Sequence, residues 1–371
     1  MAQAAGETRR ASIPIEGIEV AAYTIPTDRP ESDGTLAWDR TTLVVVHAAA
    51  GGSRGLGYTY ADVATARLVS DRLAGLVRGH DALDVPGAWA AMVRSIRNLG
   101  RPGIAQMAIA AVDAALWDLK ARICDLPLAK LLGMARERVP IYGSGGFTSY
   151  SEAELTEQLG GWVAQGIRRV KMKIGRDPAA DLARVHAART AIGPVAALFV
   201  DANGAYARKQ ALAFAERFAG EGVTWFEEPV TSDDLDGLRL LRDRAPAGMA
   251  IAAGEYGYDL AYFRRMLEAG AVDVLQADAS RAGITGFLAA ATLCEARSID
   301  LSGHCAPSLH LHPACAVQRL AHLEYFHDHV RIERMLFDGA LDPVGGALAP
   351  DLGRPGMGIE LRRADAERFA V

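Results

Sequence analysis

The chain has 371 residues, of which 50% are hydrophobic and 23% are charged, and its formal net charge is −5. These values are ordinary for a water-soluble globular protein, and a chain of this length favours two domains. Both signs of charge are spread along the sequence without a basic block, so we expect no nucleic-acid partner. No uncharged run approaches the ~20 residues that a membrane-spanning helix needs, and we expect no membrane partner.

The start of the chain and the cysteines bear on where the protein works. Residues Met1 to Ser12 are polar, include Arg9 and Arg10, and lead into no apolar segment, so the sequence predicts no signal peptide. The four cysteines form no CxxC pair and no disulfide framework. They are Cys124, Cys294, Cys305 and Cys315. A reducing cytoplasm is therefore the expected location.

Residues 1–136 combine a strand region with a helical region. The β-branched run 41–46 predicts a strand, and the glycine-rich segment 51–57 predicts a hairpin turn after it. From residue 61 to 132 the pattern is helical, most clearly over 104–123. The residues expected to form one buried stripe on that helix are Met107, Ala111, Ala114, Ala115 and Trp117. We therefore expect an α+β first domain.

After Pro140 short apolar runs and amphipathic helices alternate. The predicted helices include 152–165, 180–192 and 208–218. The predicted strands are 140–144, 169–174, 197–201, 223–227, 250–254, 272–277, 300–303 and 322–325. Eight strands with intervening helices predict an α/β fold with a closed barrel over residues 137–340 rather than an open sheet. The segment 341–371 is expected to pack back on the first domain.

Charged side chains follow these strands at nearly constant spacing. From Lys173, the chain steps 28, 26, 28, 23 and 26 residues to reach, in turn, a series of acids and one histidine. These residues are Asp201, Glu227, Glu255, Asp278 and His304. Each step is the length of one strand–helix unit of a barrel. Because the carboxyl ends of barrel strands meet at one mouth, the side chains are expected to share one cavity.

The first three acids of the series predict a metal site. Asp201, Glu227 and Glu255 would repel one another unless a cation lay between them. Oxygen ligands of this kind suit Mg²⁺, ahead of Mn²⁺, and no His or Cys stands at matching positions for Zn²⁺. Any one acid could instead be a helix N-cap or a surface charge. Three acids at successive strand ends favour the metal site.

Lys171 and Lys173 are predicted to work as a pair. Alternate residues of a strand point to the same face, so both ammonium groups are expected to face the barrel mouth. A lysine base at neutral pH needs its pKa lowered by roughly three units, about 4 kcal/mol, from about 10.4. A neighbouring ammonium and a divalent cation both act in that direction. The other interpretation is an edge strand with two solvated lysines.

His304 and Asp278 would end adjacent strands and form a second acid/base group. An aspartate that accepts from one imidazole nitrogen fixes the tautomer and supports the protonated form. His310 and His312, just downstream, could be the functional histidines instead. Glu324, at the end of the eighth strand, is a candidate to hydrogen-bond a substrate oxygen. These parts together suit removal of a proton α to a carboxylate, with metal stabilisation of the enediolate.

These motifs resemble the enolase superfamily, in particular its mandelate racemase-like subgroup. The resemblance rests on Lys171-x-Lys173, Val200-Asp201-Ala202-Asn203, Glu227-Glu228-Pro229, Gly254-Glu255, Asp278, His304, Glu324 and the helix of residues 111–119. It implies a capping α+β domain, completed by the C-terminal tail, on a modified TIM barrel, (β/α)7β. It further implies Mg²⁺ on the three acids, Lys173 as one acid/base, and the His304–Asp278 pair as the other. A homo-oligomer, dimer or octamer, is also implied.

The resemblance assigns further residues to the substrate carboxylate. It implies that Lys171, Asn203 and Glu324 polarise or position that group. One departure is that subgroup members usually carry a Gly-Gly pair after the aspartate, whereas this chain has a single glycine, Gly283. The loop after the sixth strand is therefore expected to be one residue short. Arg281 in this loop is either a substrate contact or a solvated residue, with the second favoured.

Specificity is expected from cap loops over the barrel mouth, placed at 24–35 and 50–58. The first is polar, and the second offers Arg54 and Tyr58 as substrate contacts; Ser144, ending the first barrel strand, is a further candidate. Polar loops favour a polyhydroxylated acid. The predicted reaction is β-elimination of water from an aldonate or aldarate, which gives a 2-keto-3-deoxy acid. The alternative is a racemase or epimerase of a 2-hydroxy acid with the same two bases.

Two other classes are less favoured. A binding or scaffold protein on this fold would be expected to have lost a ligand or base, and none is missing from the set. A metal-dependent hydrolase or aldolase on an ordinary TIM barrel does not account for Lys171-x-Lys173 together with His304.

Overall fold

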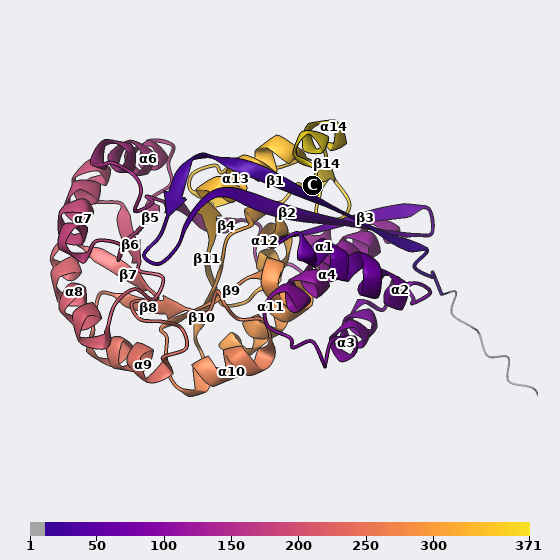
Figure 1. The fold of residues 1–371 in the computed structure, drawn as a ribbon, viewed down its shortest axis with the longest axis horizontal. Coiled ribbons are helices and arrows are strands. Elements are labelled where there is room, and N and C mark those ends of the chain that lie inside the picture. The colour runs from indigo at the N-terminus through magenta and orange to yellow at the C-terminus, as the bar shows by residue number, and fades with distance from the viewer. Residues whose placement is uncertain (1–11) are drawn as a thin grey trace, which may run out of the picture.

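The computed structural model describes residues 12–371, so the arginines used to judge a signal peptide lie outside the described residues. The chain opens with an antiparallel sheet followed by helices that pack on it (Figure 1). The strands are β1 (Gly17–Ser32), β2 (Ala37–Ala50) and β3 (Ser53–Tyr60). The helices are α1 (Ala64–Leu68), a π-helical turn η1 (Val69–Leu73), α2 (Ala74–Val77), α3 (Val85–Ser95), α4 (Ile104–Ile123) and α5 (Leu128–Leu132).

Eight parallel strands follow in sequence order, and the last pairs with the first to close a barrel. They are β4 (Val139–Gly145), β5 (Arg169–Lys173), β6 (Ala197–Asp201), β7 (Val223–Glu227), β8 (Ala250–Ala253), β9 (Val274–Ala277), β10 (Asp300–Gly303) and β11 (Leu320–Phe326). The connecting helices are α6 (Glu152–Ala164), α7 (Pro178–Ile192), α8 (Arg208–Gly220), α9 (Leu235–Arg244), α10 (Leu260–Glu268), α11 (Ala279–Ala296) and α12 (Pro307–Ala316). Figure 1 shows these helices outside the ring of strands. The predicted modified TIM barrel with an antiparallel cap is confirmed.

The barrel interior is filled with aromatic side chains just beneath the strand ends. The rings of Phe199 and Trp225 stack with their centroids 5.2 Å apart, and Tyr142 packs against both. Phe199 and Trp225 stand two residues before Asp201 and Glu227, so each pair shares one face of its strand. This apolar layer is the floor on which the polar residues at the mouth rest.

The cap is fixed to the barrel through α4. This helix was predicted to have one buried stripe, but it is buried on nearly every side, and Met107 and Trp117 are only half-buried. The reason is that α4 packs against β3 on one side and α11 on the other. Its buried Asp113 accepts hydrogen bonds from the backbone and hydroxyl of Thr285 on α11, at 2.9 and 2.6 Å.

The close approach of β3 to α4 depends on glycine, and a stability prediction follows. A Cβ atom at Gly57 would lie 2.2 Å from the carbonyl oxygen of Ala111 and 2.3 Å from the nitrogen of Ala115, both backbone atoms of α4. Since helix backbone cannot yield locally, Gly57→Ala is expected to lower the free energy of unfolding by about 3 kcal/mol. Urea denaturation measures this. The control Gly75→Ala, on exposed α2 with open space around it, is expected to be neutral or stabilising.

The predicted polar loop at 24–35 is instead part of a long hairpin. β1 pairs with β2 out to Ser32 and Ala37, with one irregularity in register between Pro26 and Glu31. Backbone pairing therefore continues through residues that composition alone assigned to a loop. The hairpin crosses the barrel mouth in Figure 1. At its tip a Cβ on Gly34 would lie 2.4 Å from the carbonyl oxygen of Ala202, so the tip rests directly on the barrel.

The C-terminal segment connects the two parts. After α13 (His327–Leu336), the short strands are β12 (Phe337–Asp338), β13 (Ala347–Leu348) and β14 (Glu360–Leu361), followed by α14 (Arg363–Ala366) and the 3-10 turn η2 (Glu367–Phe369). β13 pairs with β4 of the barrel, whereas the nitrogen of Val371 donates to the oxygen of Ala22 in the cap. The domain boundaries at 136 and 340 stay a prediction. Within residues 12–371 no helix is both long and apolar enough to cross a membrane.

Candidate active site

A cavity of about 320 Å³ lies between the cap hairpin and the carboxyl ends of the barrel strands. Its cap side is lined by residues of the β1–β2 hairpin and by Tyr60, and its barrel side by most of the strand-end residues that the spacing predicted. Asp201 and Glu227 are the exceptions, because both are fully buried. Six of the predicted site residues line it directly, namely Lys173, Asn203, Glu255, Asp278, His304 and Glu324. The strand ends thus bring together residues up to 150 positions apart in the chain.

Asp201, Glu227 and Glu255 form a compact carboxylate group. One oxygen from each lies within 4.8 Å of the others, and all three side chains are buried. Burial, followed by the charge of Asp201, raises the pKa of Glu227 to about 8. Atom Oε2 of Glu255 is buried and has no hydrogen-bond partner among the described residues. Mutual repulsion and an unsatisfied oxygen are what a bound divalent cation would relieve.

Lys171 lies fully buried beneath the cavity and does not line it. Its Nζ atom lies 2.5 Å from Glu227 Oε1, 2.7 Å from Glu324 Oε1 and 3.4 Å from Asp201 Oδ2. Burial lowers the pKa of Lys171, but the charges of Glu227 and Glu324 outweigh this and raise it well above its ordinary value. Lys171 is therefore a fixed cation that holds carboxylates in place.

Lys173 does reach the cavity, with its Nζ atom 2.5 Å from Asp201 Oδ2. The two lysines project together, so the interpretation as solvated edge-strand residues is wrong. The expected lowering of the pKa of Lys173 is not found in the metal-free protein. Burial lowers this pKa and Lys171 does too, but Asp201 outweighs them and raises it above 10.5.

His304 and Asp278 meet as the sequence predicted. The Nδ1 atom of His304 lies 2.9 Å from Asp278 Oδ2, and its Nε2 atom faces Glu255 Oε2 at 3.3 Å. Burial lowers the pKa of His304, but Glu255, Glu324 and Asp278 together raise it above 6.5. Conversely, His304 holds the pKa of Asp278 below its usual range despite burial. The pair is thus an imidazole held at Nδ1 by a carboxylate, an arrangement that favours its protonated form.

The two other histidines considered from the sequence have packing roles. The Nε2 atom of His310 accepts from the backbone nitrogen of Ala279 at 2.7 Å, and its Nδ1 faces the oxygen of Ala306 at 3.0 Å. His312 accepts from the backbone nitrogen of Ala129 at 3.1 Å. Neither lines the cavity, which leaves His304 as the one of these three histidines that does.

Glu324 lies between the lysine pair and His304. Ser144 donates to Glu324 Oε1 at 2.6 Å, and the backbone nitrogen of Cys305 donates to Oε2 at 3.0 Å. Ser144 is fully buried and does not line the cavity, so its prediction as a substrate contact is corrected. Its hydroxyl instead orients Glu324 from behind.

Arg54 and Tyr58 also lie outside the cavity. The predicted loop 50–58 is a tight turn at residues 51–52 followed by β3, so both positions are in a strand rather than over the barrel mouth. Arg54 is paired with Glu19 on the cap surface. Tyr58 is fully buried and donates to Glu333 Oε1 at 2.6 Å. The prediction that these two residues contact substrate is therefore wrong in this structure.

The segment after Asp278 is helical rather than a short loop. Asp278 caps α11 by accepting from the nitrogen of Ser280 at 2.7 Å, and Gly283 interrupts the helix with a φ of 79°. Arg281 therefore does not extend into solvent. It donates to the backbone oxygen of Glu255 at 2.9 Å and stacks over the ring of Tyr256, lining the cavity. The interpretation as a solvated residue is wrong.

Several cavity residues had no assignment from the sequence. Cys305 Sγ lies 3.3 Å from His304 Nε2, and Tyr256 and Trp38 line the walls. Glu228 is buried beside the carboxylate trio with a φ of 38°. The motif Glu227-Glu228-Pro229 and the position next to His304 were signals for Glu228 and Cys305. No sequence signal pointed to Trp38, because it is far from the barrel strands in the sequence and only the fold brings it to their mouth.

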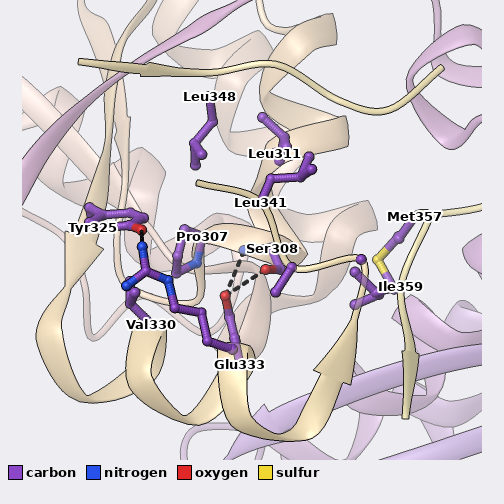
Figure 2. Close-up of a pocket in the computed structure, with 13 residues that line it drawn as sticks. Pro307, Ser308, Leu311, Tyr325, Val330, Glu333, Leu341, Leu348, Met357 and Ile359 are labelled. Carbon is purple, nitrogen blue, oxygen red and sulfur yellow. Dashed lines mark hydrogen bonds between the residues drawn. The ribbon is translucent and has the colours of Figure 1, made fainter. Parts of the chain in front are cut away.

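A second, much smaller cavity lies behind the site between α12, α13 and the C-terminal segment (Figure 2). It holds about 20 Å³, and Figure 2 shows Glu333 hydrogen-bonded to the backbone and hydroxyl of Ser308 across it. Leu311, Leu341 and Leu348 fill the remaining wall. A space of this size has room for about one water molecule, and we interpret it as packing.

Comparison with known proteins identifies the family. A family model described as the mandelate racemase / muconate lactonizing enzyme N-terminal domain matches residues 18–133, and one described as enolase C-terminal domain-like matches residues 154–366. The 3,6-anhydro-alpha-L-galactonate cycloisomerase of Streptomyces coelicolor is 34% identical over 96% of this chain and 99% of that relative.

Solved structures agree with these matches. A mandelate racemase/muconate lactonizing enzyme-like protein from Rubrobacter xylanophilus is 57% identical, with a TM-score of 0.95 over 96% of this chain and all of the other. The L-talarate/galactarate dehydratase of Salmonella typhimurium LT2, liganded with Mg and L-lyxarohydroxamate, is 27% identical, with a TM-score of 0.89 over all of this chain and 95% of the other. The chain therefore belongs to the enolase superfamily, in its mandelate racemase-like subgroup.

Proposed function

We propose that this protein is a Mg²⁺-dependent enzyme that removes the α-proton of an acid sugar and eliminates the β-oxygen, giving a 2-keto-3-deoxy acid. One observation carries the proposal. The buried carboxylate trio reaches the cavity through Glu255, and in strand order it lies between Lys173 on one side and Asp278 and His304 on the other, all three of which line the same cavity. Two acid/base groups beside one cation site suit proton removal followed by departure of an oxygen.

The carboxylate trio fits a hard divalent cation. Asp201, Glu227 and Glu255 offer only oxygen atoms, and the buried Oε2 of Glu255 accepts no hydrogen bond in the described part of the chain, although His304 Nε2 lies 3.3 Å away. When bound, Mg²⁺ would stabilise the negative charge that develops on the substrate carboxylate as the α-proton leaves.

Two side chains, Lys173 and His304, are the proposed proton-transfer groups. Lys173 is the proposed base: burial and the Lys171 ammonium act to lower its pKa, and Asp201 is the neighbour that raises it. His304, whose pKa burial lowers but the neighbouring carboxylates raise, is the proposed acid and donates from Nε2 to the leaving oxygen. Asp278 holds the imidazole by its Nδ1 atom. Asp201, when it holds Mg²⁺, would pull less strongly on the Lys173 ammonium and so favour the neutral base.

The substrate class follows from the walls of the cavity. Charge and hydrogen-bonding groups also line the cavity at Arg281, Arg40, Thr42 and Asp33. We propose that Asn203 and Glu324 contact the substrate near its carboxylate. A polyhydroxylated acid matches these surroundings better than an aryl substrate. Of the polar residues named, only Asp33 belongs to the predicted loop 24–35; Arg40 and Thr42 are on β2, and Arg281 is on α11.

A second candidate is ring opening by the same elimination. The Streptomyces coelicolor relative, 34% identical over nearly the whole of both chains, is named as a cycloisomerase of an anhydro sugar acid. In that case the leaving oxygen belongs to the sugar ring, and no water is released. The racemase or epimerase alternative uses the same two groups but returns a proton to the α-carbon.

A screen separates these candidates. The protein is incubated with Mg²⁺ in D₂O and C4–C6 aldonates, aldarates and their anhydro or lactone forms, with semicarbazide detecting keto acid and proton NMR detecting α-exchange. We expect keto acid from a small set of epimers, and none in EDTA or in the Glu255→Gln variant. Keto acid only from cyclic substrates assigns the cycloisomerase. Exchange or inversion without keto acid assigns the racemase, and silence throughout excludes the acid-sugar class.

A further inference from the structure

A second group of metal-ligating side chains lies outside the catalytic cavity. Asp28 and Glu31 belong to β1, and His327 is the first residue of α13. One ligand atom from each lies within 4.8 Å of the others. The Nε2 atom of His327 lies 3.1 Å from Asp28 Oδ2 and 3.2 Å from Oδ1. None of the three lines the catalytic cavity.

Glu31 is the unusual member of this group. Its side chain is only 1% exposed, and Oε2 accepts from Trp38 Nε1 at 2.7 Å. Atom Oε1 is buried and finds no hydrogen-bond partner within residues 12–371. Leaving a buried acceptor unsatisfied costs about 1–3 kcal/mol. Burial, followed by the charge of Asp328, raises the pKa of Glu31 to about 9. A bound proton or a nearby cation would therefore stabilise this carboxylate.

The neighbouring guanidinium groups are engaged elsewhere. Arg331 donates to Asp328 Oδ1 at 2.6 Å and to the backbone oxygen of Pro26 at 2.7 Å. Arg29 is paired with Glu154 at 3.1 Å. Neither forms an ion pair with Glu31 in the described structure. The buried carboxylate therefore lacks a cationic partner from these two side chains.

A cation can reach the group from solvent. Asp28 and His327 line a surface cavity of about 510 Å³, together with Trp162 and Arg331. Their side chains are 40% and 24% exposed, whereas Glu31 lies behind them. Two accessible ligands thus lie in front of one buried ligand, so a cation would enter this site from the surface.

We propose that Asp28, Glu31 and His327 form a second divalent-cation site that fastens the cap hairpin to the barrel. Two ligands come from the stretch of β1 whose pairing with β2 is interrupted between Pro26 and Glu31, and the third directly follows β11. The irregularity turns Asp28 out of the sheet toward His327. The site goes beyond the proposed function and shares none of its ligands.

The donor set indicates the class of metal. One imidazole nitrogen with two carboxylates suits Zn²⁺ or a similar transition metal, with a water molecule in the remaining position. It does not suit Mg²⁺, which prefers oxygen ligands throughout. The two sites of this protein would therefore differ in the metal they select.

A metal ion bound by Asp28, Glu31 and His327 would restrict access to the catalytic cavity. Asp33, Leu36 and Trp38, on the same hairpin, form the cap side of that cavity, and Phe326, next to His327, lines the barrel side. A cation held by both elements would keep the hairpin over the cavity, adding to the contact between the backbone nitrogen of Thr148 and the oxygen of Ser32 at 2.8 Å.

The test uses the full chain, stripped with EDTA, saturated with Mg²⁺ and titrated with ZnCl₂. Zinc retained after desalting is counted by mass spectrometry in wild type and in Glu31→Gln, Asp28→Asn and His327→Asn. The control is Asp39→Asn, which removes an exposed carboxylate of the same hairpin that is paired with Arg40. Zinc on the separate group His304, Cys305 and Glu324 cancels, because every variant keeps that group.

We expect the three cluster variants to bind one zinc equivalent fewer than wild type and the control. We also expect zinc to slow hydrogen exchange of the hairpin amides in wild type and in the control, but not in the three cluster variants. Equal uptake in all five proteins would overturn the site, and unchanged hairpin exchange despite uptake would overturn its fastening role. Should Glu31→Gln not fold, the changes at the partly exposed Asp28 and His327 decide the matter.

Discussion

Replacing Lys173 by alanine is expected to lower turnover by about 10³-fold or more while leaving the protein folded. A positioned base contributes roughly 10²–10⁴-fold, and Lys173 is the lysine whose ammonium both lines the cavity and contacts the carboxylate trio. Lys171 cannot replace it, because it lies beneath the cavity and is held by Glu227 and Glu324. Both keto-acid formation and α-proton exchange are therefore expected to fail together.

The measurement is initial rate and exchange in D₂O with the substrate that the screen identifies. Stability should change little with Mg²⁺ present, since Asp201 keeps Lys171 at 3.4 Å as a cationic neighbour. Lys209→Ala, on the exposed face of α8, is the matched control and is expected to be silent. Wild-type turnover in Lys173→Ala would remove this residue from the mechanism.

The barrel and the strand-end residues could be predicted from the sequence for a physical reason. A buried parallel strand reads as a short apolar run, and the polar residue that ends it must face the mouth. Asp201, Glu227 and His304 each follow such a run directly, so their meeting needed only the assumption of a closed ring. Strand boundaries accordingly differ by at most a few residues from those predicted.

The cap side of the cavity could not be predicted in the same way. Local composition at 24–35 is polar and contains proline, which indicates a loop, yet pairing with β2 holds it as a strand. Which end of the cap sheet faces the barrel is set by long-range packing of α4 on β3 and α11. The sequence therefore assigned Arg54 and Tyr58 to the cavity, whereas Trp38 and Tyr60 line it. Arg54 lies near the other end of β3, and Tyr58 is turned toward Glu333 in the interior.

The pKa of Lys173 shows a further limit of pattern reading. Two lysines on one strand face were expected to lower each other's pKa, and burial and Lys171 do act in that direction. The sequence could not show that an oxygen of Asp201 lies 2.5 Å from Nζ and outweighs them. The balance between base and ion pair thus depends on how the carboxylate trio is engaged.

Replacing His304 by asparagine is expected to lower the rate of keto-acid formation by about 10³-fold or more. Exchange of the α-proton, catalysed by Lys173, is expected to continue. The imidazole is the group that protonates the leaving oxygen, and its Nε2 atom faces the cavity beside Glu255 and Glu324. The change should not unfold the protein, because Asp278 keeps a hydrogen bond from the nitrogen of Ser280. His186→Asn, at an exposed position on α7, is the matched control.

Exchange without elimination would show that the two steps belong to different side chains. The experiment follows the α-proton of substrate by NMR in D₂O while semicarbazide reports keto acid from the same sample. Keto acid at the wild-type rate would exclude His304 as the acid. Loss of both signals in a variant that still binds Mg²⁺ would mean that His304 removes the α-proton itself. The proton would then leave from the opposite face of the α-carbon, and Lys173 would take the role of the acid.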